Sequence, residues 1–211
     1  MPKNLPKHDQ RKFHFGFHVG YNNSSFQLVT KPNIADSIIG VNVIPRPGFN
    51  LAIPIEWNAS RYIKVRFYPM YLTFQERSIN YVIKPSIRDQ DIYTINEKLE
   101  SSYIQWPVQL KFRTDRVKNF AGYVLAGGTF GIDMASQKDV IPGAILKISK
   151  IDYGYDVGIG TDFFLEYVKI GLELKLNAGI PNVLIQENSF FSSPIQSLKT
   201  RAWMFTITIE S

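Results

Sequence analysis

The segment from Phe13 to Tyr21 alternates between apolar residues and polar or glycine residues, and this alternation constrains the fold more than any other feature of the chain. Successive side chains of a β-strand point to opposite faces. This strand therefore has one face suited to an apolar medium and one suited to polar side chains and water. The apolar face holds Phe13, Phe15, Phe17, Val19 and Tyr21, and the other holds His14, Gly16, His18 and Gly20.

The same pattern recurs about eight times along the chain, and no run approaches the ~18 apolar residues of a membrane helix. No amphipathic helix of convincing length interrupts it. The expected strands cover about residues 12–22, 49–57, 62–74, 104–113, 120–134, 152–163, 168–177 and 203–210. In the third of these, Ile63, Val65, Phe67 and Tyr71 are expected to share the apolar face.

Composition narrows the protein classes. A chain of 211 residues without a Ser/Gly linker or a low-complexity tract suits one domain. Cysteine is absent, so neither a disulfide framework nor thiol chemistry is expected. The net charge of +6 is not gathered in a basic stripe with interleaved aromatics, which argues against a nucleic-acid partner. No signal-peptide pattern opens the sequence, so in an exported protein the signal would already have been removed.

The connections between the expected strands alternate in length, with short turns after the second, fourth and sixth strands. The long loops cover about residues 23–46, 77–101, 135–149 and 181–198. This layout is typical of an all-β, eight-stranded antiparallel up-and-down transmembrane β-barrel. An even strand count places both termini at the short-turn rim, which is periplasmic in such barrels. We expect an N-terminal periplasmic segment over residues 1–11 and an outer-membrane barrel over residues 12–211.

The direction of the apolar face decides between a membrane barrel and a soluble ligand-binding barrel. The interior of an eight-stranded barrel is only just wide enough to be filled by side chains. The bulky apolar set would overfill it unless it opened into a lipocalin-like cup, whereas the glycine-rich polar set fits. We therefore predict a membrane barrel plugged by charge pairs between basic strands one, three and four and acidic strand six. The expected polar network in the lumen comprises Lys12, His14, His18, Glu56, Lys64, Arg66, Lys111, Arg113, Asp152, Asp156, Asp162, Glu173 and Lys175.

Pro54, Pro69 and Pro107 lie inside expected strands, where each removes a hydrogen bond from the ladder. They indicate β-bulges or different strand limits. A sharper hypothesis is that strands two to four form a weakened wall that docks a larger membrane protein. The candidate partner contacts are Ile53, Phe67 and Trp106 on that wall, with Phe190 and Phe191 on the last loop unless these two pack against their own loop.

Catalytic and metal chemistry find no support in the spacing of the residues. His14 and His18 share a face, but four strand residues separate them by roughly 13 Å, too far to chelate one metal. No catalytic set can be assembled without choosing freely among loops. We expect no enzyme activity, cofactor or metal; the alternative is a barrel enzyme or a barrel that binds a lipid or small ligand.

Several segments resemble the PorT family of Bacteroidota, in an order that spans nearly the whole chain. They are Phe13–Phe17, Pro47–Phe49, Val65–Pro69, Glu100–Pro107, Ala121–Gly128, Asp152–Gly158 and Glu173–Leu176. The resemblance implies a small outer-membrane barrel that is needed for type IX protein secretion and, in gliding species, for motility. It supplies no catalytic motif. The expected partners are outer-membrane lipid and a larger outer-membrane protein or secretion complex.

Overall fold

The computed structural model describes residues 4–6, 8–32, 38–84, 92–135, 146–187 and 190–211, and eight strands close into one barrel. Each strand pairs antiparallel with its neighbours in sequence, and β1 closes the ring against β8. The short 3-10 helix η1 (His8–Gln10) precedes them. The strands are β1 (Phe13–Thr30), β2 (Ile38–Asn58), β3 (Ile63–Ile83), β4 (Tyr93–Arg113), β5 (Phe120–Asp133), β6 (Ile151–Phe164), β7 (Lys169–Gly179) and β8 (Ile195–Glu210).

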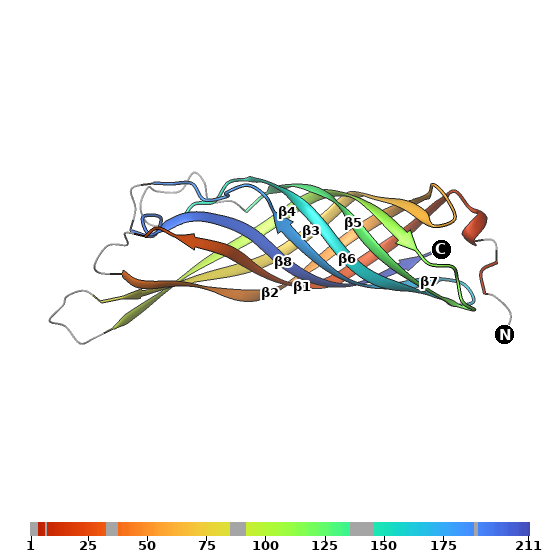
Figure 1. The fold of residues 1–211 in the computed structure, drawn as a ribbon, viewed down its shortest axis with the longest axis horizontal. Coiled ribbons are helices and arrows are strands. Elements are labelled where there is room, and N and C mark those ends of the chain that lie inside the picture. Colours follow the sequence, from red (N-terminus) through yellow and green to blue (C-terminus); the bar gives the residue numbers. More distant parts are fainter. Residues whose placement is uncertain (1–3, 7, 33–37, 85–91, 136–145, 188–189) are drawn as a thin grey trace.

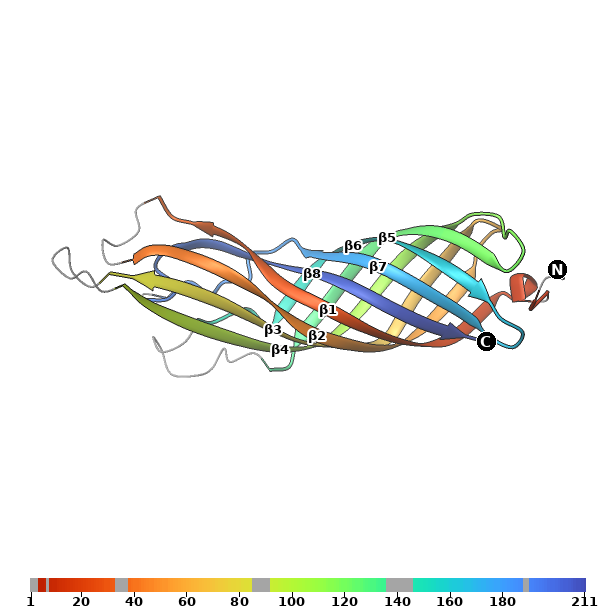
Figure 2. The same ribbon diagram turned by 90° about the horizontal axis from the view of Figure 1, so that it is seen from below.

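This arrangement confirms the predicted eight-stranded meander. Figure 1 places the three short turns and both termini at one end of the barrel, and Figure 2 shows the same arrangement from below. The opposite end carries the four longer connections. We call these ends the short-turn rim and the long-loop end. No described segment forms a helix long and apolar enough to cross a membrane.

The first four strands are longer than the sequence predicted. They contain 18 to 21 residues each, whereas about 9–11 suffice to cross a bilayer. Much of the expected loops 23–46 and 77–101 is therefore strand, and these strands project past the others at the long-loop end (Figure 1). The last residues of the expected loop 181–198 likewise belong to β8, which begins at Ile195.

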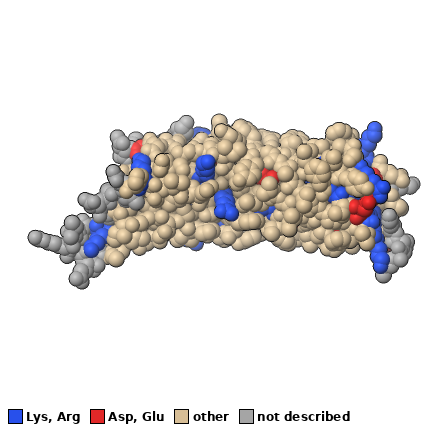
Figure 3. Space-filling model, in the orientation of Figure 1, with Lys and Arg blue, Asp and Glu red and all other residues tan. Residues whose placement is uncertain are grey.

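The apolar face points outward around most of the barrel. Large aromatic side chains that a water-soluble protein would bury stay about half exposed, which is the signature of a lipid-facing wall. Most of the surface in Figure 3 is uncharged, and charged side chains gather most densely at the short-turn rim. The exposed aromatics include Phe13, Phe15, Phe17, Tyr21, Phe49, Trp57, Phe112, Phe120, Trp203 and Phe205.

The alternation along β1 changes phase near its middle. From Phe13 to Tyr21 the apolar residues face out, but beyond Ser24 the inward positions are apolar and include Phe26, which is 5% exposed. Leu28 and its partner Leu198 on β8 continue this inward apolar set. The strand expected over residues 12–22 therefore ended too early, because one phase was expected throughout.

The three in-strand prolines lie side by side around a bulge in β3. Between Phe67 and Tyr71, β3 carries one more residue than β2 or β4. Pro54 lies in β2 opposite this bulge and Pro107 opposite it in β4, so the ladder is already irregular where the prolines interrupt it. This confirms the prediction that the in-strand prolines mark a β-bulge.

The bulge also reverses which positions of β3 face inward. Tyr71 was predicted to share the outer face with Ile63, Val65 and Phe67, and this is wrong. Arg66 faces inward before the bulge, and Tyr71, with 1% exposure, faces inward after it. An extra residue shifts the alternation by one position, so odd-numbered residues take over the interior.

Candidate functional site

Eight ionised side chains meet inside the half of the barrel nearer the short-turn rim, and we call them the charge cluster. Six of the eight strands contribute, and four cations face four carboxylates. Each member is at most 2% exposed, so the cluster closes the lumen rather than lining a water-filled channel. The members are Glu56, Lys64, Arg66, Lys111, Asp162, Lys169, Glu173 and Glu210.

Glu56 of β2 is the hub of the charge cluster. Its Oε1 accepts from Lys64 Nζ at 2.8 Å and from Lys169 Nζ at 3.3 Å. Its Oε2 accepts from Arg66 Nη2 at 3.1 Å and from Lys111 Nζ at 3.4 Å. The predicted plug of basic strands against acidic strand six is therefore only partly right, because the carboxylate that gathers the cations belongs to β2.

Three other carboxylates complete the cluster. Asp162 of β6 lies 2.9 Å from Lys111 Nζ, and Glu173 of β7 lies 2.7 Å from Arg66 Nη1. Glu210 at the end of β8 pairs with Lys169. A buried charge with no partner costs several kcal/mol, whereas a fully connected set of pairs roughly offsets the cost of removing its charges from water.

A tyrosine from β5 wedges into the charge cluster. The Tyr123 hydroxyl donates to Glu173 Oε2 at 3.1 Å, and Lys111 Nζ lies 3.7 Å from the centre of its ring. Gly160 on β6 makes room for it, since a Cβ there would lie 2.3 Å from the Tyr123 ring. Gly160 is therefore required for Tyr123 to pack in the charge cluster.

A second polar layer lies around Asp156 of β6. Its Oδ2 accepts from Gln109 Nε2 at 2.7 Å and from Thr129 Oγ1 at 2.8 Å, and its Oδ1 accepts from Asn177 Nδ2 at 2.7 Å. Lys175 Nζ is 3.9 Å away. Hydrogen bonds from uncharged side chains therefore stabilise the Asp156 carboxylate more directly than an ion pair does.

Beside the Asp156 layer, Tyr68 and Tyr71 pack edge to face with ring centres 5.1 Å apart. His18 of β1 lies 5.5 Å from each tyrosine ring and shares a 3.0 Å hydrogen bond with Thr208. Lys175 Nζ lies 4.9 Å from the Tyr71 ring centre. The lumen is thus packed with aromatic side chains as well as ionic ones.

The structure buries all of the predicted lumen residues except one. Lys12 is exposed, because β1 begins one residue later and leaves it at the short-turn rim. Lys169 and Glu210, which the prediction omitted, belong to the charge cluster. Their inward position in the alternation was a usable signal. Those buried are His14, His18, Glu56, Lys64, Arg66, Lys111, Arg113, Asp152, Asp156, Asp162, Glu173 and Lys175.

The segment before β1 packs across the short-turn rim. The buried His8 ring stacks on His14 with centres 3.8 Å apart and meets Phe164 edge-on. Asn4 is anchored to Asn119 by a 2.9 Å hydrogen bond. Burial and nearby lysines lower the pKa of His8 to about 3, so this ring is neutral at pH 7.

Asp9, the next residue of η1, ties the segment to two arginines. Its Oδ1 lies 2.8 Å from Arg113 Nη2, and its Oδ2 lies 3.8 Å from Arg116 Nη1. Burial alone would raise the pKa of Asp9, but the hydrogen bond and the charge of Arg113 outweigh it and hold the pKa below its usual value.

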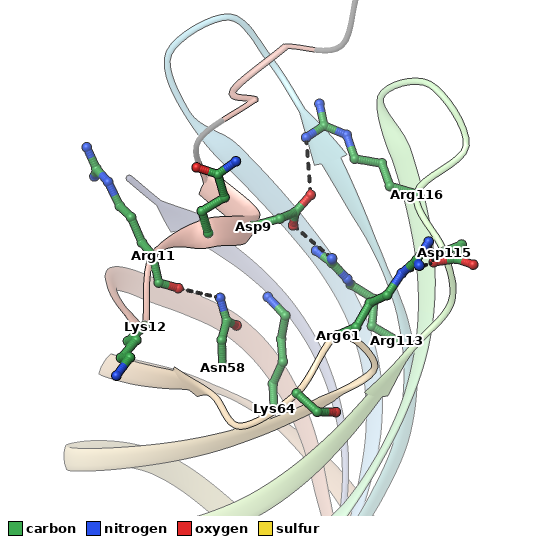
Figure 4. Close-up of a pocket in the computed structure, with 11 residues that line it drawn as sticks. Asp9, Arg11, Lys12, Asn58, Arg61, Lys64, Arg113, Asp115 and Arg116 are labelled. Atoms are coloured by element: carbon green, nitrogen blue, oxygen red, sulfur yellow. Dashed lines mark hydrogen bonds and ion pairs between the residues drawn. The ribbon is translucent and has the colours of Figure 1, made fainter.

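A cavity of about 390 Å³ opens beside η1, and we call it the rim pocket (Figure 4). Its lining comes from the N-terminal segment, the β2–β3 and β4–β5 turns and the strand ends next to them. Six of its lining side chains are basic and two are acidic. The lining residues are Asp9, Gln10, Arg11, Lys12, Asn58, Ser60, Arg61, Lys64, Arg113, Asp115 and Arg116.

The interior at the long-loop end is apolar, and we call it the loop-end core. Phe191, one of the predicted partner contacts, packs against it, and the Tyr81 hydroxyl donates to its carbonyl at 2.8 Å. Phe190 is 42% exposed. Phe191 therefore packs within its own end of the barrel, whereas part of the Phe190 side chain is accessible. The buried members are Phe26, Ile38, Val41, Ile79, Tyr81, Leu99, Leu146, Ile148, Val183, Leu184, Ile195 and Leu198.

We call the part of β2 to β4 around Pro54, Pro69 and Pro107 the proline wall, and the partner contacts predicted on it lie on the outside of the barrel. Ile53 is 43% exposed and Phe67 is 39% exposed, while Trp106 is half-buried against Phe130 with ring centres 6.1 Å apart. Among the described residues, no group of three or more His, Asp or Glu side chains is arranged to hold a metal ion.

Three solved structures align with most of this chain at low sequence identity. Neisserial surface protein A matches with a TM-score of 0.48 and 8% identity, over 92% of this chain and 96% of that chain. Ail of Yersinia pestis, in complex with the heparin analogue sucrose octasulfate, matches at 0.42 and 15%, over 95% and 100%. OprG from Pseudomonas aeruginosa matches at 0.42 and 13%, over 94% and 91%.

No curated protein matches the sequence. A family model does: the one described as outer membrane protein beta-barrel domain covers residues 4–184, most of the chain. The closed eight-stranded ring and its apolar outer wall agree with that description. The chain belongs to the outer membrane protein β-barrel domain family and is a protein of the outer membrane.

Proposed function

We propose that this protein is a non-enzymatic accessory or assembly factor of type IX protein secretion, which acts through contacts with other membrane proteins. In this proposal the short-turn rim and both termini face the periplasm. The lipid-facing wall and the long-loop end carry the partner contacts. The resemblance to the PorT family over nearly the whole chain supplies the pathway.

The observation that carries the proposal is that the barrel is closed inside at two levels. The charge cluster fills the lumen nearer the short-turn rim, and the loop-end core fills the other end. Among the described residues, the members of the charge cluster are at most 2% exposed and the buried members of the loop-end core are at most 9% exposed, so side chains occupy the lumen at both levels. Because the interior is occupied, function falls to the outer surface and the rims.

The proline wall is the part of that surface best suited to a partner. Its ladder is interrupted by Pro54, Pro69 and Pro107 around one bulge, so its backbone is less regular than the rest of the barrel. Ile53 and Phe67 project from it beside the bulge. A membrane protein that docks there would replace lipid with complementary side chains.

Site-specific crosslinking in native membranes tests the partner contact. A photoreactive residue at Ile53, Phe67 or Trp106 should capture a membrane protein. Val157 on β6 and Leu174 on β7 are matched controls, with 42% and 44% exposure on the opposite wall. Capture of lipid alone at all five positions would contradict a docking wall.

Deletion of the protein in its native cells tests the pathway. Loss of type IX cargo from the medium, restored by the wild-type chain, is the expected result. Unchanged export would contradict the proposed role even if crosslinking found a partner. The deletion strain should also lose gliding if the cells glide.

The absence of cysteine makes the orientation testable. A single cysteine in place of Ser60, in the β2–β3 turn, should resist a membrane-impermeant maleimide in intact cells and react after the outer membrane is opened. A cysteine in place of Ser193, which is exposed at the long-loop end, should react in both conditions. The reverse pattern would invert the proposed topology.

A further inference from the structure

The rim pocket is strongly basic, and its charges are unevenly matched. Arg61 pairs with Asp115 at 2.8 Å, and Arg113 and Arg116 share Asp9. Lys64 pairs with Glu56 of the charge cluster at 2.8 Å, and no carboxylate among the described residues pairs with Arg11 or Lys12. The pocket therefore retains an excess of positive charge around an open volume, which favours an anion.

Arg113 gives a second and independent indication of a ligand. Its side chain is more than nine-tenths buried, and only Nη2 has a partner, the carboxylate of Asp9. Its Nε and Nη1 meet no acceptor within the described parts of the chain. Buried donors of this kind are normally satisfied, and a guanidinium matches the paired oxygens of a phosphate.

An apolar groove of about 590 Å³ lies on the outer wall next to the rim pocket. Arg113 also lines this groove. Phe112, Val124 and Ile159 supply its apolar surface. Gly122 leaves it open, because a Cβ at that position would meet no atom within 4 Å. A basic pocket and an apolar groove thus share one residue at the edge of the lipid-facing wall.

We propose that these two cavities together bind one membrane phospholipid, with its phosphate in the rim pocket and an acyl chain in the groove on the outer wall. The phosphate oxygens would satisfy the free donors of Arg113 and balance Arg11 and Lys12. The acyl chain would cover the apolar surface around Gly122. This site does not depend on a role in type IX secretion, so either proposal can fail while the other stands.

Native mass spectrometry of the full chain in a mild detergent tests the site directly. The barrel is titrated with phosphatidylglycerol, with diacylglycerol of the same chains, and with inorganic phosphate. One phosphatidylglycerol should be retained at least about tenfold more tightly than diacylglycerol. Equal retention of the two, or no retained lipid, would overturn the proposal.

Two substitutions separate the headgroup from the tail. R113K keeps the charge but loses the planar fork, and should weaken phosphatidylglycerol binding about tenfold. G122L fills the outer groove where there is open space, and should weaken phosphatidylglycerol without changing the response to inorganic phosphate. G40L is the matched control, since a Cβ at Gly40 on β2 also meets no atom within 4 Å.

The outcomes distinguish the two sources of phosphate. If inorganic phosphate binds as tightly as phosphatidylglycerol and G122L changes neither, the pocket takes a free anion and the phospholipid proposal is wrong. If R113K leaves phosphatidylglycerol binding unchanged, the guanidinium does not contact the headgroup and the proposed site is wrong. The circular dichroism of each variant, compared with wild type, ensures that a loss of binding is not a loss of fold.

Discussion

The charge cluster and the loop-end core lie inside the same barrel, on strands that run through both, yet they have opposite chemistry. Around the charge cluster the outer wall is apolar and the interior ionic. Around the loop-end core the interior is apolar, and β1 turns polar residues such as Gln27 outward. The inward face of a single strand carries His14 and His18 in one region and Phe26 in the other.

The surrounding medium explains this difference. Lipid leaves no hydrophobic gain for an apolar interior, so the lumen within the bilayer is held by hydrogen bonds and charge pairs and the wall is apolar. Strands that project into water regain the usual preference for buried apolar side chains. We therefore expect the edge of the membrane near the position along β1 where the alternation changes phase.

The largest expected effect comes from removing the hub of the charge cluster. E56Q would leave four buried cations with only three carboxylates. Breaking a buried ionic network in this way costs about 3–5 kcal/mol. Urea unfolding in lipid vesicles, followed by tryptophan fluorescence, should show that loss of stability.

A paired variant sharpens this prediction. Adding K111M to E56Q removes one cation and restores three charges of each sign. The double variant should therefore be more stable than E56Q alone, because the cluster again carries equal numbers of positive and negative charges. If the two losses simply add, the cluster is not a connected network.

The loop-end core should respond to lost volume rather than lost charge. Leu198 is fully buried there, so L198A should cost about 2–4 kcal/mol through the cavity it leaves. The same truncation at the lipid-facing Leu174 should cost less, because lipid fills the space. A loss that varied strongly with salt would contradict an apolar origin.

The packing of Tyr123 offers a smaller effect within the charge cluster. G160A would place a Cβ 2.3 Å from the Tyr123 ring and 2.7 Å from the Leu172 carbonyl oxygen. Overpacking of this kind costs about 1–3 kcal/mol. G122A adds the same group to open space on β5 and serves as the control, with no loss expected in the same unfolding measurement.

The fold was predictable because alternation over several residues is a strong signal for a strand, and its repetition fixed the strand number. The inward residues of β6 and β7 followed from the same rule. The outer ends of β1 to β4 were missed because there the alternation continues in the opposite phase. Tyr71 was placed on the wrong face because no local pattern reveals the extra residue in β3.

The candidate sites were less predictable than the fold. A strand pattern shows which side chains face inward, but not which of them meet across the lumen, so the role of Glu56 as a hub was hidden. The rim pocket brings Asp9 next to Arg113 and Arg116. These two arginines lie about a hundred residues after Asp9 in the sequence. The segment before β1 carries no alternation that would indicate its docking.

The smallest expected effect concerns that segment and depends on pH. The pKa of His8 is about 3 when docked and about 6.5 when free, so the released segment binds more protons between these values. Docking is therefore complete above about pH 6.5 and weakens as the pH falls. His14 below it and the nearby charges of Lys64 and Lys169 all oppose a proton on His8, while the negative charge of Asp9 favours one.

Limited proteolysis of the folded barrel at pH 7 and pH 5 measures this docking. Cleavage in the first twelve residues should become about tenfold faster at pH 5 relative to a cleavage-control peptide, because a proton on His8 breaks the stack on His14. H8F keeps an aromatic ring against His14 and Phe164 but cannot titrate, so its cleavage should change much less. Equal cleavage of the wild type at both pH values would mean that the rim holds the segment through Asp9 and Asn4 alone, and that the charge-based packing of this end of the barrel does not extend to His8.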